Sequence, residues 1–161
     1  MNDNEDVPIR DAATVILLRK KKDSTYVLMG QRGNKAVFMP SKYVFPGGAV
    51  DEDDSNVKLF KSIKKKGINL LHKYSKKKIA KELCVAAIRE LWEEAGLRLC
   101  AKVDDVGTIS PKWKDFCSGL YLPDASNLEY VFRAITPPGR PRRFDARFFI
   151  CRAENIHGNL D

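Results

Sequence analysis

Stretches of continuous or alternating apolar residues mark the expected strands in the first third of the chain. Residues 13–19 form an apolar, β-branched run that predicts a first strand, and residues 26–32 predict a second. The charged stretch 20–24 lies between these runs, so the two strands are expected to form a hairpin. Residues 43–51 predict a further strand that runs into two consecutive glycines.

A helical repeat of apolar residues follows in the middle of the chain. Its members recur at helical spacing and would form one stripe suited to packing on a sheet: Cys84, Ala87, Ile88, Leu91, Trp92 and Ala95. Gly96 is the expected end of this helix. Beyond it the pattern predicts, in order, a strand at 97–103, a strand and turn at 107–114, a short helical segment at 124–131, a strand at 132–136, a loop at 137–143 and a strand at 144–152.

The polar side of this helix is unusual because it concentrates carboxylates. At about 100° per residue, Glu90, Glu93 and Glu94 fall within an arc of roughly 100°. Glu90 and Glu94 are like-charge neighbours four residues apart, and Glu93 and Glu94 lie in the last turn, where the helix dipole disfavours anions. Arg89 offsets one carboxylate and leaves a surplus that a divalent cation with oxygen ligands would neutralise. An ordinary solvent-exposed acidic face is the alternative interpretation.

Two separated stretches together resemble the Nudix box, the signature of the Nudix hydrolase superfamily. In that box a glycine is followed by five residues, a glutamate, seven residues and then Arg-Glu-aliphatic-x-Glu-Glu-x-Gly-aliphatic. Paired glycines allow a ligand to approach the backbone closely, and Gly47-Gly48 corresponds to the first half of the box. The second half is matched at every fixed position: Arg89, Glu90, Leu91, Glu93, Glu94, Gly96 and Leu97.

The first half of the box departs from the pattern in two ways. After Gly48 and five further residues the chain has Asp54 where the box has Glu. From Asp54 to Arg89 there are 34 intervening residues (89 − 54 − 1) instead of seven, so an insertion of 27 residues (34 − 7), roughly 55–81, splits the motif. Both departures leave the role of Asp54 open. Glu82 lies one position out of register and receives no role.

The insertion at 55–81 carries ten lysines and no acidic residue, against a net charge of +8 for the whole chain. Its apolar residues predict two short amphipathic helices broken at Gly67. Such a patch could attract polyanions: nucleic acid, a membrane surface or a phosphorylated substrate. Lys73 and residues 76–78 are the candidates for steering a substrate, and a solvated lysine-rich surface is the alternative.

Length and composition fit a small globular enzyme. The 161 residues are expected to form one domain, with 43% hydrophobic and 31% charged residues. No apolar run approaches the roughly 20 residues that span a bilayer, and the acidic start is unlike a signal peptide. A cytoplasmic location is therefore expected, with the four cysteines at 84, 100, 117 and 151 as buried, reduced thiols.

The C-terminal part narrows the resemblance. Ile135-Thr136-Pro137 and Arg143-Phe144-Asp145-x-Arg147-Phe148-Phe149 are similar to a bacterial Nudix subgroup with long box insertions, related to peroxisomal-type coenzyme A diphosphatases. The resemblance implies an α/β fold of the α+β kind, an α/β/α sandwich with a mixed β-sheet, in which the chain ends before the family's last strand and helix. We therefore expect an apolar sheet face that is exposed or covered by a homo-oligomer.

The resemblance also implies a reaction: metal-dependent hydrolysis of the diphosphate linkage in a small-molecule nucleoside diphosphate derivative, with a coenzyme A-like compound as one candidate. Glu90, Glu93 and Glu94 would hold Mg²⁺ or Mn²⁺. Glu90, Glu94 or a metal-bound water would act as general base. Arg89 would orient a carboxylate, and the Gly47-Gly48 backbone would lie against the metal or the phosphates.

Arginines outside the box are candidates for substrate contact. Arg32 ends the second predicted strand, Arg142 and Arg143 belong to the basic loop 137–143, and Arg147 follows in the next strand. A solvated strand end for Arg32, and ion pairs with the domain surface for the others, are the alternatives. Two other functions stay open: a catalytically impaired Nudix-fold binding module, and an RNA-directed pyrophosphohydrolase that rests on the lysine-rich insertion.

Overall fold

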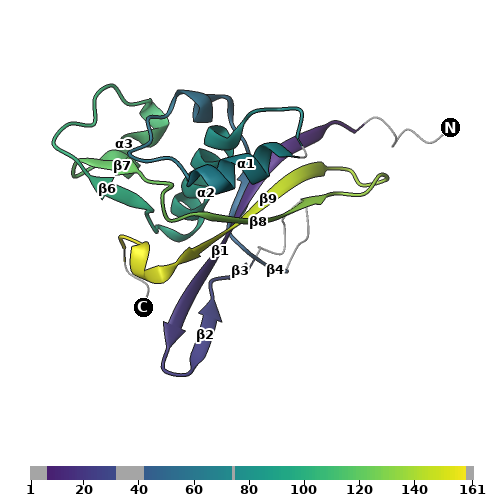
Figure 1. The fold of residues 1–161 in the computed structure, drawn as a ribbon, viewed down its shortest axis with the longest axis horizontal. Helices are drawn as coiled ribbons and strands as arrows, with labels where there is room; N and C mark the ends of the chain where they lie inside the picture. Colours follow the sequence, from purple (N-terminus) through teal and green to yellow (C-terminus); the bar gives the residue numbers. More distant parts are fainter. Residues whose placement is uncertain (1–6, 32–41, 74, 159–161) are drawn as a thin grey trace.

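A long strand, β1 (Ile9–Lys21), is the centre of the computed structural model, which describes residues 7–31, 42–73 and 75–158. The other strands are β2 (Ser24–Val27), β3 (Gly30–Gln31), β4 (Tyr43–Val44), β5 (Gly47–Ala49), β6 (Cys100–Lys102), β7 (Tyr121–Pro123), β8 (Glu129–Ile135) and β9 (Arg143–Arg152). The helices are α1 (Lys65–Lys73), α2 (Ala80–Ala95) and α3 (Lys114–Cys117), with 3-10 turns η1 (Glu52–Asn56), η2 (Pro111–Trp113) and η3 (Ala153–Asn155). Figure 1 shows their arrangement.

The main sheet is mixed and has the strand order β2-β1-β9-β8. On one edge β1 runs parallel to β9, from the pair Ile9–Arg143 to the pair Leu18–Arg152. On its other edge β1 pairs antiparallel with β5 near its start and with β2 near its end. β8 completes the sheet antiparallel to β9. The expected mixed sheet and the β1–β2 hairpin are therefore confirmed.

Helix α2 covers one face of this sheet with the apolar stripe that the sequence predicts. Ile88 and Leu91 are fully buried and share a core with Val15 of β1 and Phe149 of β9. The helix ends at Gly96, whose φ of 67° is left-handed and whose N–H bonds the Trp92 carbonyl. In the described ranges of the chain, no helix is long and apolar enough to cross a membrane.

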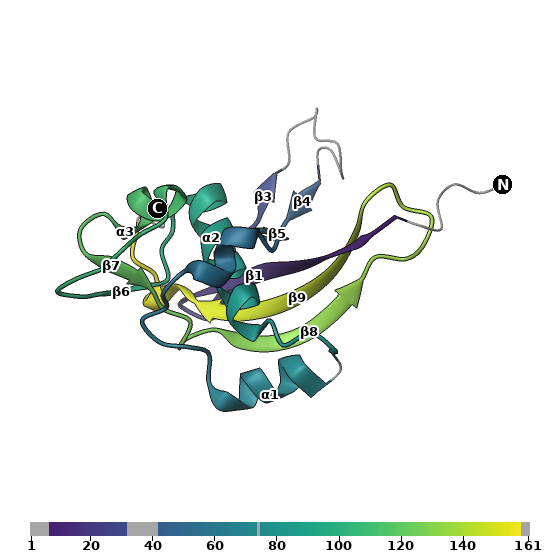
Figure 2. The ribbon, with the colours of Figure 1, turned by 90° about the horizontal axis from the view of Figure 1, so that it is seen from above.

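The insertion contributes a short helix, α1, which lies beside β8 on the side of the sheet that α2 also covers (Figures 1 and 2). Gly67 lies in the first turn of α1, so the predicted helix break at this glycine is wrong. Glycine fits there because a Cβ at this position would come within 2.8 Å of the Cδ1 atom of Ile63, which is buried. The glycine thus permits close packing inside the helix instead of ending it.

The two ends of the insertion lie next to each other. The Nζ atom of Lys81 donates to the carbonyl oxygen of Ser55 at 2.7 Å. Between these ends, Lys77 forms an ion pair with Asp11 of β1 at 2.6 Å. The insertion therefore leaves the fold and returns to it at one place, and is fastened to β1 on the way.

Several predicted elements differ from the observed ones. The strand expected at 26–32 is divided into β2 and β3, and the one at 97–103 is reduced to β6, which pairs with β7. Residues 107–114 form a loop and η2 instead of a strand, because Pro111 occupies the first position of a helical turn, where proline is favoured.

The helical segment expected at 124–131 is also wrong, since a turn there leads directly into β8. Asp124 accepts a hydrogen bond from the Ser126 N–H at 2.9 Å. The Asp124 carboxylate, which could cap a helix, is the acceptor of this local turn. The residue types that often start helices therefore form a loop at this position.

The sheet face opposite α2 carries no helix within the described residues (Figure 1). Phe148 of β9 lies between buried neighbours along the strand and stacks on Phe132 of β8, with ring centroids 4.2 Å apart. Phe132 is 45% exposed, and Val27 of β2 is 47% exposed. The expected apolar, open sheet face is present in this part of the chain, while the second helical layer of an α/β/α sandwich is not seen there.

Candidate functional site

The carboxylates of α2 lie against the glycine pair of β5. Gly48 pairs with Ala13 of β1, and a Cβ added to Gly48 would overlap the carboxylate of Glu90. On the next turn of the helix Glu94 accepts a hydrogen bond from the Gly47 N–H at 3.1 Å. The absence of a side chain at Gly48 therefore allows Glu90 to lie against β5, and the two halves of the motif touch.

Arg89 connects the acidic groups of the site. Its Nη1 atom donates to Glu90 at 2.8 Å and to Glu93 at 3.3 Å, and its Nη2 atom donates to the Ala49 carbonyl at 2.9 Å. The guanidinium is only 8% exposed, whereas the Glu93 side chain is 51% exposed. Arg89 thus orients both carboxylates from below, while Glu93 faces solvent.

Asp54 is the site residue whose role the sequence left open. Its side chain is fully buried, and its two oxygens accept from the Nε and Nη2 atoms of Arg89 at 3.0 and 3.2 Å. Asp54 also accepts from the Asp51 N–H at 2.8 Å, which holds η1 in place. The spacing from Gly48 pointed to this residue, and the structure gives it a positioning role through Arg89 despite the insertion.

The surroundings of the site act differently on the charged forms of Glu90 and Arg89. Burial raises the pKa of Glu90, and the charges of Glu93 and Glu94 raise it further, which outweighs the lowering by Arg89. Burial alone would lower the pKa of Arg89, but its bonds and charge interactions with Asp54 and Glu90 raise it. Arg89 therefore stays positively charged, and its surroundings destabilise the ionised form of Glu90.

The donor set has the chemistry of a site for a hard divalent cation. Glu90, Glu93 and Glu94 offer carboxylate oxygens, while the single positive charge of Arg89 is already shared with the buried Asp54. As the side chains lie, however, no group of three potential ligands that could hold a metal is formed among the described residues.

The predicted substrate-contacting arginines lie in different surroundings. Arg147 is 2% exposed, and its Nη1 atom pairs with Asp11 at 2.7 Å and with Asp145 at 3.1 Å. These bonds hold it inside the sheet, which corresponds to the ion-pair alternative. Arg143 donates to the Thr136 carbonyl at 3.2 Å and Arg142 is exposed in the β8–β9 loop. Arg32 lies outside the described residues.

All four cysteines are free thiols; Cys84, Cys117 and Cys151 are buried as expected, whereas Cys100 is only partly buried. Burial raises the pKa of the Cys84 thiol to about 12, and burial likewise raises the pKa of Cys151 to about 12. Burial also raises the pKa values of Cys100 and Cys117. None of these groups is activated as a nucleophile, so the chemistry of the site rests on carboxylates.

Comparisons with known proteins bear on the family and the fold of this chain. No family model matches the chain. A Caenorhabditis elegans protein named "Putative nudix hydrolase 7" is 29% identical over 158 residues, which cover 91% of this chain and 45% of that protein. The chain thus spans less than half the length of this curated relative.

Two solved structures align with the chain, and one of them supports the fold. A Nudix hydrolase from Alicyclobacillus acidocaldarius aligns with a TM-score of 0.70 and 25% identity, covering 95% of this chain and 76% of that one. A Nudix hydrolase from M. smegmatis covers 94% of this chain and 66% of that one at 15% identity, but its TM-score of 0.43 carries no argument.

The mixed α+β fold is therefore a Nudix fold. Together with the residues of the box, the nematode relative and the bacterial structure support a place for this chain in the Nudix hydrolase superfamily. They do not extend to the coenzyme A diphosphatase-like subgroup.

Proposed function

We propose that this chain is a pyrophosphohydrolase that cleaves the diphosphate linkage of a nucleoside diphosphate derivative with Mg²⁺ or Mn²⁺ as cofactor. The observation that carries the proposal is the convergence of Glu90 and Glu94 on the Gly47-Gly48 backbone, with Arg89 beneath them. Carboxylates arranged in this way are electrostatically unfavourable in the absence of a positively charged ligand. The Nudix relatives support hydrolysis of pyrophosphate bonds as the class of reaction.

Each residue of the site has a proposed task. Glu90, Glu93 and Glu94 would hold the metal, which when bound supplies charge neutralisation for the diphosphate. Glu90 or Glu94 takes the proton from the attacking water, and a raised pKa brings Glu90 closer to the range that suits a general base. Arg89, held by Asp54, keeps Glu90 and Glu93 in position. The Gly47-Gly48 backbone provides a surface that phosphate oxygens can approach.

The residues for substrate contact remain a proposal as well. Arg142 in the β8–β9 loop and Arg143 at the start of β9 are proposed to bind the nucleotide portion, because guanidinium groups suit phosphate oxygens. The resemblance of residues 135–149 to the coenzyme A-related subgroup supports a coenzyme A-like substrate. The lysines of α1 lie beside β8, across the main sheet from β5, which weakens the case for an RNA-directed reaction at the carboxylates.

The test is hydrolysis of a panel of nucleoside diphosphate derivatives by the 161-residue chain, with and without Mg²⁺ or Mn²⁺. We expect metal-dependent release of a nucleoside monophosphate from at least one member. Glu94→Gln should abolish this turnover and leave the fold intact, whereas Glu82→Gln on the same helix should retain it. Retained activity in Glu94→Gln would contradict the mechanism.

The contact of Arg89 with Glu90 and Glu93 favours one other function. If these carboxylates stay paired with Arg89, the chain is a Nudix-fold binding module without catalysis. Calorimetry with Mn²⁺ distinguishes the two. Metal binding that Glu90→Gln weakens supports the enzyme, and nucleotide binding that needs no metal and gives no product supports the module.

A further inference from the structure

Helix α1 has an outward face that is rich in lysine. Successive residues of a helix are about 100° apart, which divides the nine residues of α1 into two sides. One side packs on the protein, and its Leu71 is 5% exposed and belongs to the core. The residues of the other side are all exposed: Lys65, Lys66, Asn69, Leu70 and Lys73. The apolar stripe of α1 is therefore used for internal packing, and a basic face is left toward solvent.

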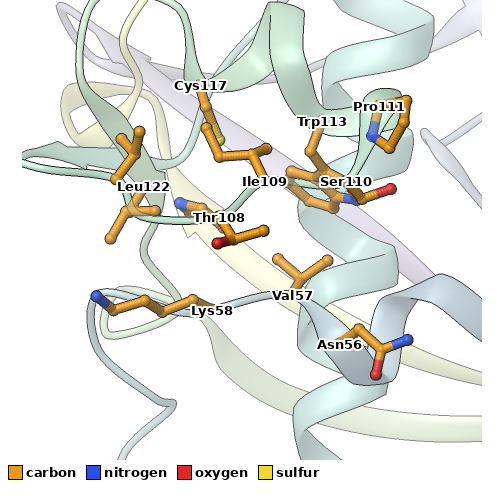
Figure 3. A pocket seen from close by; sticks show the side chains of 12 residues that line it. Asn56, Val57, Lys58, Thr108, Ile109, Ser110, Pro111, Trp113, Cys117 and Leu122 are labelled. Carbon is orange, nitrogen blue, oxygen red and sulfur yellow. The ribbon is translucent and has the colours of Figure 1, made fainter.

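The chain ahead of α1 is held by the body of the protein, which fixes the orientation of this face. In Figure 3 the side chain of Val57 lies toward Trp113 across a cavity of about 480 Å³, whereas Lys58 extends away from it. Further along the chain, the N–H of Phe60 donates to the Pro123 carbonyl at 2.8 Å. The insertion thus turns apolar side chains inward and leaves lysine side chains outside.

Positive charge is concentrated in this part of the chain and is not neutralised there. Residues 55–81 carry ten lysines and no acidic residue, so the rest of the chain sums to −2 (8 − 10). Lys64, Lys65 and Lys66 form no ion pair with any residue that the structure describes. Glu129 of β8 borders the same groove as Lys64 and Lys66 without pairing with either. An anionic surface is therefore attracted to α1 and weakly repelled by the remainder of the molecule.

Leu70 distinguishes between the polyanions that such a face attracts. It is 39% exposed and shares the outward side of α1 with Lys66 and Lys73. An exposed leucine gains nothing from the phosphates of a nucleic acid, whereas it gains free energy by entering the apolar region of a bilayer. Proteins that bind single strands stack bases on aromatic rings, and the five described residues of this outward side include none. The combination favours a membrane surface that contains anionic lipid.

The basic face is also separate from the carboxylate site. α1 lies beside β8, at one edge of the main sheet, whereas β5 with its glycine pair joins the other edge of β1 (Figure 2). Two strands, β1 and β9, lie between β5 and β8. Lipid bound at α1 and substrate bound at the carboxylates therefore do not compete for the same residues.

We propose that the outward face of α1 docks the protein on a membrane surface that contains anionic lipid. Lys65, Lys66 and Lys73 lie against the phosphates and carboxylates of the headgroups, and Leu70 enters the apolar region beneath them. A lysine near such a surface contributes about 1 kcal/mol, or about fivefold in the partition coefficient, within about one Debye length. The association is peripheral and weakened by salt, and it requires neither a metal nor turnover.

The experiment is co-sedimentation of the 161-residue chain with vesicles of phosphatidylcholine, with and without phosphatidylserine. We expect binding to the vesicles that contain phosphatidylserine at about 0.1 M salt, and loss of this binding at about 1 M salt. The combined replacement Lys65→Gln, Lys66→Gln and Lys73→Gln should lower the partition coefficient by about 100-fold, since three lysines contribute about fivefold each.

A matched control removes the same charge elsewhere. Lys20, Lys21 and Lys22 are exposed at the β1–β2 turn, which Figure 1 places far from α1. Their combined replacement by glutamine should change the partition coefficient by less than about fivefold, because they lie beyond the reach of the bound surface. Equal losses in the two triple variants would show that net charge alone drives the binding and would overturn the inference.

The apolar part of the contact has its own test. Leu70→Ser should weaken binding to the anionic vesicles by about fivefold, whereas Leu120→Ser, at a leucine that is 44% exposed ahead of β7, should leave it unchanged. A second arm replaces the vesicles by a single-stranded RNA. Binding of RNA that is tighter than binding of vesicles and is insensitive to Leu70→Ser would assign the face to nucleic acid and overturn the inference. Absence of binding to anionic vesicles by the folded protein would overturn it as well.

Discussion

Asp54 and Arg89 form a buried, bidentate ion pair across the insertion that divides the motif resembling the Nudix box. Asp54 Oδ1 lies 3.0 Å from Arg89 Nε, and Asp54 Oδ2 lies 3.2 Å from Arg89 Nη2. The same guanidinium reaches Glu90 and Glu93. Arg89 thus links η1 to the carboxylates of α2. The Asp54 side chain, although shorter than the Glu of the box pattern, is long enough to reach Arg89.

Replacing Asp54 tests this connection. Asp54→Asn removes the fully buried, bidentate partner of Arg89, which then keeps its ion pairs with Glu90 and Glu93, and should lower the free energy of unfolding by about 3 kcal/mol. Asp53→Asn is the control, because the Asp53 side chain is 43% exposed and its ion pair with the exposed Lys112 is screened by solvent, so its loss should be much smaller. Urea unfolding of the two variants measures the difference. Equal losses would show that Asp54 has no special role.

Neutralising Glu90 should separate stability from activity. The pKa of Glu90 in the folded state is raised above its ordinary value of 4.5. Protonated Glu90 therefore contributes stability at pH values below 4.5, and this contribution is lost as the pH rises through the pKa of the folded state. Glu90→Gln should therefore be at least as stable as the parent at pH 7, with a smaller loss of stability between acid and neutral pH. Thermal unfolding across this range measures it.

The activity of Glu90→Gln should fall by about 100-fold or more, because it removes a proposed metal ligand and candidate base. A variant that is less stable than the parent at pH 7 would contradict the assigned electrostatics. A variant that keeps full activity would contradict the proposed role of Glu90.

Gly48 gives a test of fine positioning. In Gly48→Ala the new methyl group meets the carboxylate end of Glu90, which can swing aside, so the loss of stability should be below about 1 kcal/mol. The displaced Glu90 should reduce kcat/KM by about 100-fold, since small displacements in an active site have effects of this size. Gly30→Ala is the matched control, because nothing lies within 4 Å of its added Cβ. Similar activity in the two variants would sink the prediction.

The cysteines provide a measure of local opening. With their pKa values raised to about 12, Cys84 and Cys151 should be unreactive toward iodoacetamide in the native protein at pH 8. Both should react rapidly in denaturant, with mass spectrometry of peptides reporting each site. Rapid native modification of Cys84, which lies fully buried on α2, would mean that the helix opens on its own.

The parts of the fold that the sequence predicts well have strong local signals. The stripe of α2 and its end at Gly96 rest on helical spacing and on a left-handed cap, and both are observed. β9, whose apolar and polar residues alternate, lies at Arg143–Arg152, almost as expected. The predictions that failed rest on residue types with two uses. Asp124 closes a turn instead of starting a helix, and Gly67 packs inside α1 instead of ending it.

The candidate site divides in the same way. The fixed spacing of the second half-motif singled out Glu90, Glu93 and Glu94 as site residues, whereas the contacts of Glu90 and Glu94 with the glycine pair are seen only in the structure. The role of Asp54 could not be predicted, because the folded path of the insertion between it and Arg89 decides whether they meet. Arg147 carries the same charge as Arg142 but is buried with Asp11 and Asp145, and its partners come from distant parts of the chain.

The contact between Lys81 and Ser55 has a consequence for how such a motif changes over time. Because both ends of the insertion lie within reach of one lysine side chain, its length is set by loop closure and not by the geometry of the site. Closing a loop of twice the length costs only about 0.6 kcal/mol more. Residues can therefore be gained or lost between the two half-motifs almost without thermodynamic penalty. The spacing between the half-motifs therefore reflects shared ancestry more than the requirements of the reaction.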